Sequence, residues 1–119
     1  MKIKNKPVIL ITGASSGIGA ACAERLSKAG CRVIGTSRKP VTGNGFEMIQ
    51  MDVTDDESVK KTVRHVLEKE GRIDILINNA GISLVGSIED TSINEAKLQI
   101  DTNFFGPHRV CRAVLPHMR

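Results

Sequence analysis

Apolar positions along the chain fall into two kinds of pattern, and each kind predicts one type of element. Short runs rich in Val, Ile and Leu are typical of strands that are buried on both faces of a parallel sheet. We predict strands over residues 7–12, 31–36, 46–51 and 73–77. Apolar and small residues recur instead at helical spacing over residues 18–29, 56–69 and about 92–118, which predicts helices.

Residues that favour helix ends agree with these boundaries. Gly30 and Gly71 follow the first two helices, and glycine readily takes the left-handed conformation that ends a helix. Thr54 or Asp55 caps the start of the second helix, because either side chain can accept a hydrogen bond from a free backbone N–H. The apolar spacing and the caps therefore define the same elements.

The last helical segment carries both a start signal and a break. Thr91 or Ser92 precedes it, and Glu95 follows three or four positions on, which is the spacing of a capping box. We expect Gly106 and Pro107 to interrupt the helix, because proline has no N–H and its ring displaces a carbonyl of the preceding turn. The sequence therefore predicts a helix in two parts, one on either side of this pair.

Strands and helices alternate along the chain, and this order determines the fold class. Parallel neighbours need a crossover connection, which a helix supplies, so the alternation predicts βαβ units and a parallel sheet. The predicted class is α/β, with residues 1–119 as one domain. The right-handed crossover rule then fixes which face of the sheet each helix covers.

Composition places the chain among ordinary soluble globular proteins. It has 119 residues, 40% hydrophobic and 25% charged, which allows one domain with a modest core. Cys22, Cys31 and Cys111 are scattered and show no metal-ligand spacing, so free thiols in a reducing compartment are expected. The basic start resembles a secretion signal, but the apolar run after it is too short, and no stretch reaches transmembrane length. We therefore expect a cytoplasmic protein without a bound metal or a membrane partner.

Charge is distributed unevenly along the chain, whose formal net charge is +4. Residues 1–40 carry eight Lys and Arg against one acid, and residues 41–119 carry nine against twelve. A basic front half fits nucleic-acid binding, but the sequence has no aromatic residues between the basic ones and no nucleic-acid motif. A small ligand that carries phosphate explains the same bias, and we expect no nucleic-acid partner.

A glycine-rich turn joins the first predicted strand to the first predicted helix. Residues 12–19 read Thr-Gly-Ala-Ser-Ser-Gly-Ile-Gly. Glycines let the backbone turn sharply and approach a pyrophosphate, and the helix that follows offers free N–H groups and a positive dipole end. The spacing differs from the general G-x-G-x-x-G fingerprint, and a tight structural turn is the alternative. The candidate cofactor contacts in this turn are Gly13, Ser15, Ser16, Gly17, Ile18 and Gly19.

A second motif, Asn78-Asn79-Ala80-Gly81, follows the fourth predicted strand. Together with the glycine-rich turn, it resembles the short-chain dehydrogenase/reductase family, and the resemblance covers residues 6–119. This resemblance implies a Rossmann-type doubly wound parallel sheet, present in part, with strand order 3-2-1-4 and the later strands missing. It also implies that Asn79, Ala80 and Gly81 steady the sheet and line the adenosine side of a nicotinamide cofactor. A simple turn residue is the alternative role for Asn79.

Two further positions match the family. Asp52 resembles the acid whose carboxylate accepts the adenine amino group, with Val53 next to it, and a helix-capping carboxylate is the alternative. Asn103 matches the active-site asparagine whose backbone carbonyl holds a water of the proton relay, so it is the catalytic candidate. Pro107 lies four residues on and has no N–H, which leaves that carbonyl free. An asparagine that merely accompanies a kink is the alternative.

The end of the second predicted strand indicates which nicotinamide cofactor binds. NAD-binding folds usually place Asp or Glu there, on the ribose 2′-hydroxyl. This chain has no acid nearby; Ser37 can donate to a 2′-phosphate, and Arg38 can pair with it and stack on adenine. We therefore expect NADP(H) rather than NAD(H). Solvated loop charges are the alternative role for Arg38 and Lys39.

The other catalytic residues of the family, a Ser and a Tyr-x-x-x-Lys, have no match in this sequence. Members use a Ser and a Tyr-x-x-x-Lys to interconvert an alcohol and a carbonyl, and this chain contains no Tyr. The resemblance therefore implies the cofactor-binding half of an NADP(H)-dependent oxidoreductase, and we expect the 119-residue chain alone to be inactive. A catalytically dead module that binds a nucleotide or complements a partner, and that truly ends at Arg119, is the alternative. Neither reading identifies the small-molecule substrate.

Exposed apolar surface is expected on the chain taken alone. Residues 73–77 become an apolar strand at the edge of the sheet, and such edges pair with other chains. Residues 103–118 resemble the main subunit-contact helix of the family, on which we expect Val110, Val114 and Leu115 to lack cover. We therefore expect the chain to associate with a second copy in a homo-oligomer, or to occur only as part of a longer protein.

Overall fold

Four parallel strands form the sheet in the structure, a computed structural model that describes residues 6–119. Most of the basic start discussed above lies outside the described residues. The strands are β1 (Val8–Ile11), β2 (Arg32–Ser37), β3 (Glu47–Gln50) and β4 (Ile75–Ile77). Their order in the sheet, β3-β2-β1-β4, confirms the predicted order and the α/β class.

The last strand begins two residues later than predicted because a side chain replaces part of its backbone pairing. The Val8 N–H donates to Oδ2 of Asp74 (2.7 Å), and the Asp74 N–H donates to the Val8 carbonyl (2.9 Å). Ile73 nevertheless is 97% buried, with 3% of its surface exposed. The apolar run therefore predicts burial correctly, whereas the regular backbone ladder starts only at Ile75.

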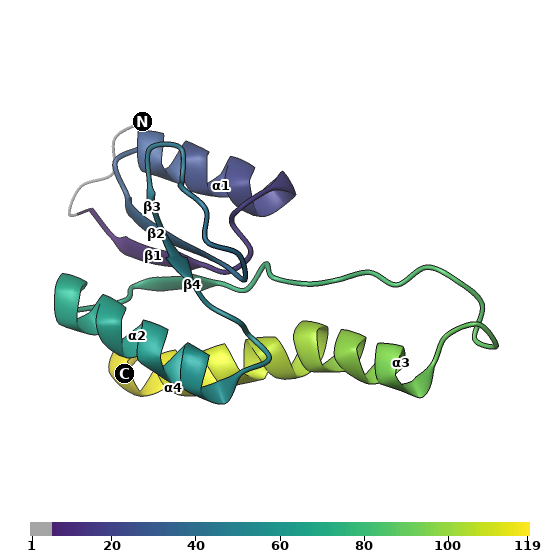
Figure 1. The fold of residues 1–119 in the computed structure, drawn as a ribbon. Coiled ribbons are helices and arrows are strands. Elements are labelled where there is room, and N and C mark those ends of the chain that lie inside the picture. The colour runs from purple at the N-terminus through teal and green to yellow at the C-terminus, as the bar shows by residue number, and fades with distance from the viewer. Residues whose placement is uncertain (1–5) are drawn as a thin grey trace.

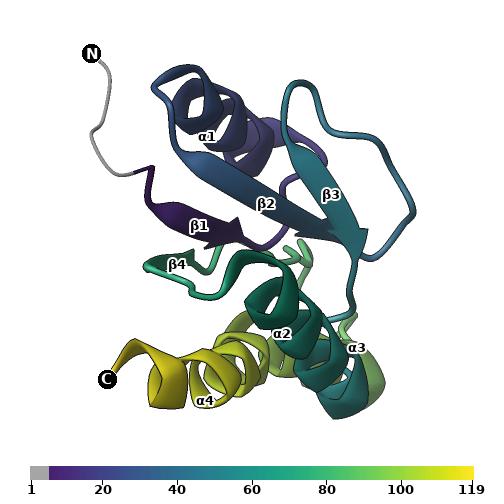
Figure 2. The same ribbon diagram turned by 90° about the vertical axis from the view of Figure 1, so that its left-hand side faces the viewer.

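Helices cover both faces of the sheet, as Figures 1 and 2 show. Helix α1 (Gly17–Lys28) lies on one face, and α2 (Asp56–Glu70) and α4 (Gly106–Met118) lie side by side on the other. Alternate residues of β1 supply the two cores: Ile9 and Ile11 pack with the α1 side, and Val8 and Leu10 with the α2 and α4 side. A sheet covered on both faces requires continuous apolar strands, which the sequence provides.

The helix caps take one of the two residues expected at each position. Asp55 caps α2, since its Oδ1 accepts hydrogen bonds from the backbone N–H groups of Glu57 and Ser58. Ser92 caps α3 (Ile93–Ile100), where it forms a complete capping box with Glu95. The backbone and side-chain hydrogen bonds from Ser92 lower the pKa of the Glu95 carboxyl below its usual range.

The predicted break at Gly106 and Pro107 is wrong. Helix α3 continues without interruption into a π-helical turn, η1 (Asp101–Phe105), and then into α4. The Gly106 N–H donates to the Asp101 carbonyl, five residues back. Pro107 follows directly after this wider turn and lies in the first turn of α4, where its missing N–H is tolerated. The proline therefore coincides with a change of helix type rather than a break.

The expectation that α4 lacks cover is also wrong for two of its three apolar positions. Val110 and Val114 are fully buried, in one core with Val59 and Val63 of α2. Only Leu115 is exposed, over 51% of its surface. The reason is that α2 and α4 pack against each other on the same face of the sheet, so each covers the apolar face of the other. Among the described residues, no helix combines the length and the apolar character that crossing a membrane requires.

An ion-pair network joins β2, β3 and α2 at the amino end of the strands. Arg32 pairs with Glu70 (2.5 Å) and with Glu47 (2.6 Å), and Lys69 pairs with Glu47 (2.8 Å). The hydrogen bond with Glu70 raises the pKa of the Arg32 guanidinium, and the hydrogen bond from Lys69 lowers the pKa of the Glu47 carboxyl. The network ties the end of α2 to the sheet, at the edge opposite the site described next.

Candidate functional site

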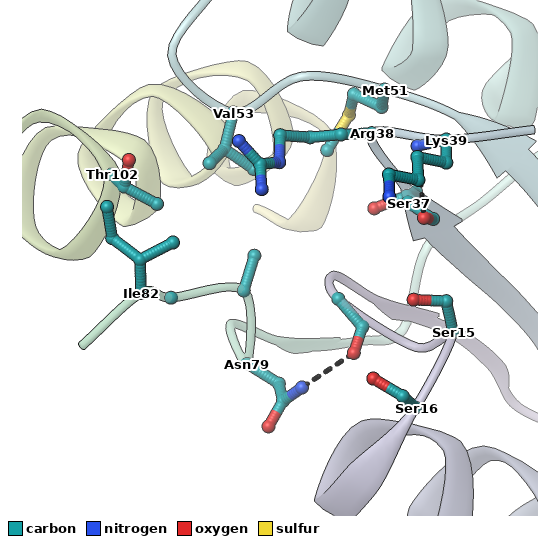
Figure 3. Close-up of a pocket in the computed structure, with 14 residues that line it drawn as sticks. Ser15, Ser16, Ser37, Arg38, Lys39, Met51, Val53, Asn79, Ile82 and Thr102 are labelled. Carbon is teal, nitrogen blue, oxygen red and sulfur yellow. Dashed lines mark hydrogen bonds between the residues drawn. The ribbon is translucent and has the colours of Figure 1, made fainter. Parts of the chain in front are cut away.

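A pocket of about 390 Å³ opens at the carboxyl ends of the four strands (Figure 3). Ligands of open α/β sheets bind at this edge. The lining residues come from the end of β2, from the segments that follow the strands and from the π-helical turn. They are Gly13, Ser15, Ser16, Thr36, Ser37, Arg38, Lys39, Met51, Val53, Asn79, Ala80, Gly81, Ile82 and Thr102.

The floor of the pocket is formed where the glycine-rich turn packs directly on the segment after β4. Gly13 has a φ of +67°, and a Cβ at this position would lie 2.7 Å from the Ala80 Cα. A Cβ at Gly19 would lie 2.2 Å from the Gly13 carbonyl oxygen and 2.4 Å from Nδ2 of Asn79. Backbone meets backbone here, so only glycine fits at either position without a shift of the chain.

Hydrogen bonds fix the same two segments to each other. The buried Thr12 hydroxyl accepts from the backbone N–H groups of Asn79 and Ala80, both at 3.0 Å. The side chain of Asn79 donates from Nδ2 to the Gly13 carbonyl at 2.8 Å, as the dashed line in Figure 3 marks. The two motifs that stand 66 residues apart in the sequence therefore form one rigid unit.

The start of α1 lies beside the pocket and has no side-chain cap. Ser16 occupies the capping position without a capping hydrogen bond, and the first turn of α1 contains no acidic residue. Both α2 and α3, in contrast, begin with an Asp or Ser side chain that accepts from the first turn. The free N–H groups of α1, its positive dipole end and the nearby hydroxyls of Ser15 and Ser16 suit an anionic ligand.

Basic and hydroxyl groups gather at the end of β2, where none of the lining residues is acidic. The Ser37 hydroxyl oxygen accepts from the Lys39 N–H (3.2 Å), which leaves its hydrogen to donate. The Gln50 side-chain amide donates to the Arg38 carbonyl (3.0 Å) and so fixes the backbone there. In Figure 3 the Arg38 side chain extends across the pocket toward Val53. The arrangement presents positive charge to an anionic group in the pocket.

The segment after β3 places its two candidate residues differently. Val53 is buried and forms part of the pocket wall. Oδ1 of Asp52 accepts from both the backbone N–H and the hydroxyl of Thr54, at 2.9 and 2.7 Å. Asp52 lines an adjoining groove rather than this pocket, together with Arg38 and Gln50. Its carboxylate therefore holds the turn that leads to α2.

Asn103 of the π-helical turn holds the chain segment that leaves the pocket. Its Oδ1 accepts from the Ile82 N–H (2.8 Å), and its Nδ2 donates to the Ile82 carbonyl (2.7 Å). The preceding residue, Thr102, lines the pocket, and its hydroxyl donates to the Leu98 carbonyl (2.8 Å). The turn therefore connects the wall of the pocket to α3 and to the segment after Gly81.

The pocket contains most, but not all, of the residues that the sequence singles out. Nine of them line it: Gly13, Ser15, Ser16, Ser37, Arg38, Val53, Asn79, Ala80 and Gly81. The five that do not line it are Gly17, Ile18, Gly19, Asp52 and Asn103. Five lining residues were missed, namely Thr36, Lys39, Met51, Ile82 and Thr102. Each of these five residues is directly next to a predicted site residue in the sequence. Extending each predicted segment by one residue would therefore have included all five.

The whole described chain agrees with one protein family. Residues 7–119 match the family model described as short chain dehydrogenase. The chain belongs to the short-chain dehydrogenase family. The 3-2-1-4 sheet, the glycine-rich turn and the Asn-Asn-Ala-Gly segment are therefore parts of a short-chain dehydrogenase.

Relatives of this member of the short-chain dehydrogenase family include a reductase and proteins of solved structure. A 3-ketodihydrosphingosine reductase from Bacteroides thetaiotaomicron is 48% identical over 113 residues, which cover 94% of this chain and 42% of that protein. The ligand-free aldohexose dehydrogenase of Thermoplasma acidophilum superposes with a TM-score of 0.91 at 38% identity, covering 95% of this chain and 44% of the other. ElxO with NADP bound superposes with a TM-score of 0.86 at 34% identity, covering 95% and 50%. The chain thus spans between two fifths and half of each relative.

Proposed function

We propose that the protein containing this chain is an NADP(H)-dependent oxidoreductase that interconverts an alcohol and a carbonyl, and that residues 1–119 supply its cofactor-binding half. The observation that carries the proposal is the end of β2, where Ser37, Arg38 and Lys39 line the pocket without an acidic neighbour in its lining. An acid there would repel a 2′-phosphate, whereas a guanidinium forms charge-assisted hydrogen bonds with it.

The residues present fit the remaining parts of the cofactor. The uncapped start of α1, with Ser15 and Ser16 beside it, suits the pyrophosphate. In Figure 3 the Arg38 guanidinium lies beside Val53, so an adenine ring bound there would contact both a planar cation and an apolar side chain. The segment Asn79–Gly81 would line the adenosine side. The neighbouring structure of ElxO, which holds NADP, supports the same choice of cofactor.

The nicotinamide cofactor supplies the hydride when it is bound. The chain contributes binding and orientation, and we assign to Asn103 the role of holding a water through its backbone carbonyl. The sequence contains no tyrosine, so the tyrosine proton donor of the family is not among these 119 residues. The residues described here are therefore expected to bind the cofactor without turning over a substrate.

A 3-keto sphingoid base is the substrate that we propose to assay first. The support is the 48% identity to the 3-ketodihydrosphingosine reductase over almost the whole of this chain. Reduction of its ketone would consume NADPH. The homo-oligomer stays a prediction as well, and sedimentation of the complete protein would test it.

The test of the proposed function compares NADPH with NADH in the complete protein that contains this chain. We expect oxidation of NADPH in the presence of 3-ketodihydrosphingosine, with a kcat/KM at least about tenfold higher than with NADH, as loss of one phosphate contact predicts. Equal use of both cofactors would refute the NADP(H) assignment. Tight NADPH binding without turnover of any ketone would favour the alternative, a nucleotide-binding module without activity.

A further inference from the structure

Arg109, which lies in the second turn of α4, links three separate elements around the pocket. Its side chain is 21% exposed. Nη1 donates to the Val53 carbonyl (3.0 Å), and Nη2 donates to Oδ1 of Asp101 (2.5 Å). Nη1 also lies 3.4 Å from the Asp101 carbonyl, and Nε lies 3.9 Å from Oδ1 of Asp56. One guanidinium therefore joins the segment after β3, the start of α2 and the first residue of the π-helical turn.

Two of the three residues that Arg109 holds, Val53 and Asp101, lead directly to the pocket. Val53 is itself part of the wall, and Thr102, which follows Asp101, is another part. Arg109 does not line the pocket. It therefore contacts no ligand placed there, and any influence on binding must pass through the residues that it positions.

Gly106 adds a second contact between α4 and the same wall. A Cβ at this position would lie 2.9 Å from Cγ2 and 3.2 Å from Cβ of Val53. The Val53 side chain thus rests directly on the helix backbone, one turn before Arg109, while its carbonyl is held by the guanidinium. The side chain and the backbone of Val53 are both fixed from α4.

We propose that Arg109 is a positioning residue that sets the Val53 wall against Arg38 and, through Asp101, fixes the π-helical turn at the same time. The proposal rests on the proposed function, because the ligand that would contact the Val53 wall is the adenosine half of NADP(H). A planar fork can hold the Val53 carbonyl and the Asp101 carboxylate together, whereas a lysine ammonium on a flexible stem holds one of them at a time. The arginine thereby connects the adenosine side of the pocket with the turn that carries Asn103.

Replacing the guanidinium changes ligand binding by a predictable route. In Arg109→Met the stem remains, but the hydrogen bonds to the Val53 carbonyl and to Asp101 are lost, so the backbone of the Val53 segment is held less firmly before the ligand binds. Since a hydrogen bond to a charged group contributes a factor of ten or more to an equilibrium, we expect binding of an adenosine ligand to weaken about tenfold. Arg109→Lys keeps the ion pair with Asp101 and should fall between Arg109→Met and the original protein.

The experiment is an isothermal calorimetric titration of the complete protein with adenosine 2′,5′-bisphosphate. It is run at a temperature well below the unfolding temperature of each variant. Arg112→Met is the matched control, because it removes the same charge from an exposed position on the same helix. We expect Arg112→Met to bind like the original protein and Arg109→Met to bind about tenfold more weakly. In the Val53→Ala background, Arg109→Met should add little further loss, since a shared route makes the two changes non-additive.

The outcomes separate this inference from the proposed function. Failure of the original protein to bind the bisphosphate would overturn both. Binding by the original protein with equal affinity in Arg109→Met would overturn only the positioning role, as would fully additive losses with Val53→Ala. If Arg109→Met does not fold, the affinity of Arg109→Lys decides, and an affinity equal to that of the original protein would overturn the proposal.

Discussion

Replacing Gly19 by alanine should destabilise the protein more than replacing Gly17, although both glycines belong to the same turn. Gly17 has a φ of +58°, and a Cβ there would meet no atom within 4 Å. Gly19 has an ordinary helical position, but a Cβ there would lie 2.2 Å from the Gly13 carbonyl oxygen and 2.4 Å from Nδ2 of Asn79. The first position is limited by backbone conformation alone, and the second by space alone.

The expected cost of each change follows from these two causes. Alanine at Gly17 takes a left-handed conformation that costs roughly 1–2 kcal/mol, partly offset because alanine restricts the unfolded chain, so the net loss is about 1 kcal/mol or less. Alanine at Gly19 must displace backbone by roughly 1 Å to restore van der Waals contact, which costs about 1–3 kcal/mol. Displacement of the Asn79 amide costs about 1 kcal/mol more of stability, since its hydrogen bond to Gly13 is lost. The higher helix propensity of alanine offsets this second cost by about the same amount. The net loss at Gly19 is therefore about 2 kcal/mol, at least twice that at Gly17.

The free energy of unfolding in urea, measured for both variants of the complete protein at one protein concentration without ligand, tests this comparison. The slope of the transition must stay the same, so that a changed midpoint reports stability alone. Far-ultraviolet circular dichroism before the transition checks that each variant keeps its helices. If Gly17→Ala lost as much stability as Gly19→Ala, or more, the close packing of the turn on the Asn79 segment would be wrong.

Three further changes test the site and the network at the far edge of the sheet. Arg38→Asp should weaken NADPH binding by about 1.5–3 kcal/mol and NADH binding far less, and equal losses in a fluorescence titration would refute the phosphate contact. Because the pKa of Glu47 is lowered, its stabilisation is complete above the ordinary value of 4.5 and is lost as the pH falls through the lowered value. Glu47→Gln should therefore lose less stability between about pH 5 and 3, and an unchanged pH profile of urea unfolding would contradict this. Asn103→Ala should speed hydrogen exchange at the Ile82 N–H, which loses its acceptor, and mass spectrometry showing unchanged protection would speak against that anchor.

The sequence predicts the sheet and its strand order well because each buried strand is a continuous apolar run. The same holds for the turn residues around the pocket, which glycine and asparagine mark by their spacing. The hydrogen bonds of Asp52 could not be predicted in this way. Its carboxylate accepts from Thr54, and this pairing depends on the local backbone conformation, which the residue pattern does not specify.

The spacing of apolar residues along the sequence does not predict which distant segments contact each other. Apolar spacing shows that Val110 and Val114 share a face, but it does not show that α2 covers that face. The π-helical turn depends on a hydrogen bond displaced by one residue, which leaves the apolar spacing of the flanking helices almost unchanged. Arg109 reaches a carbonyl 56 residues away in the sequence, so nothing near it in the chain indicates its partner.

The π-helical turn also determines which kinds of mutation this region tolerates. A π-helical turn contains about one residue more than an α-helical turn, so deleting one residue from Asp101–Phe105 can convert it to α-helix while the two flanking helices keep their relative orientation. Val110 and Val114 would then stay in the core, and a deletion after Asn103 would also leave Asn103 beside Ile82. Deletion of the exposed Phe104 or Phe105 should therefore be tolerated better than deletion of one residue elsewhere in the long helix, which would turn its two ends by about 100° relative to each other.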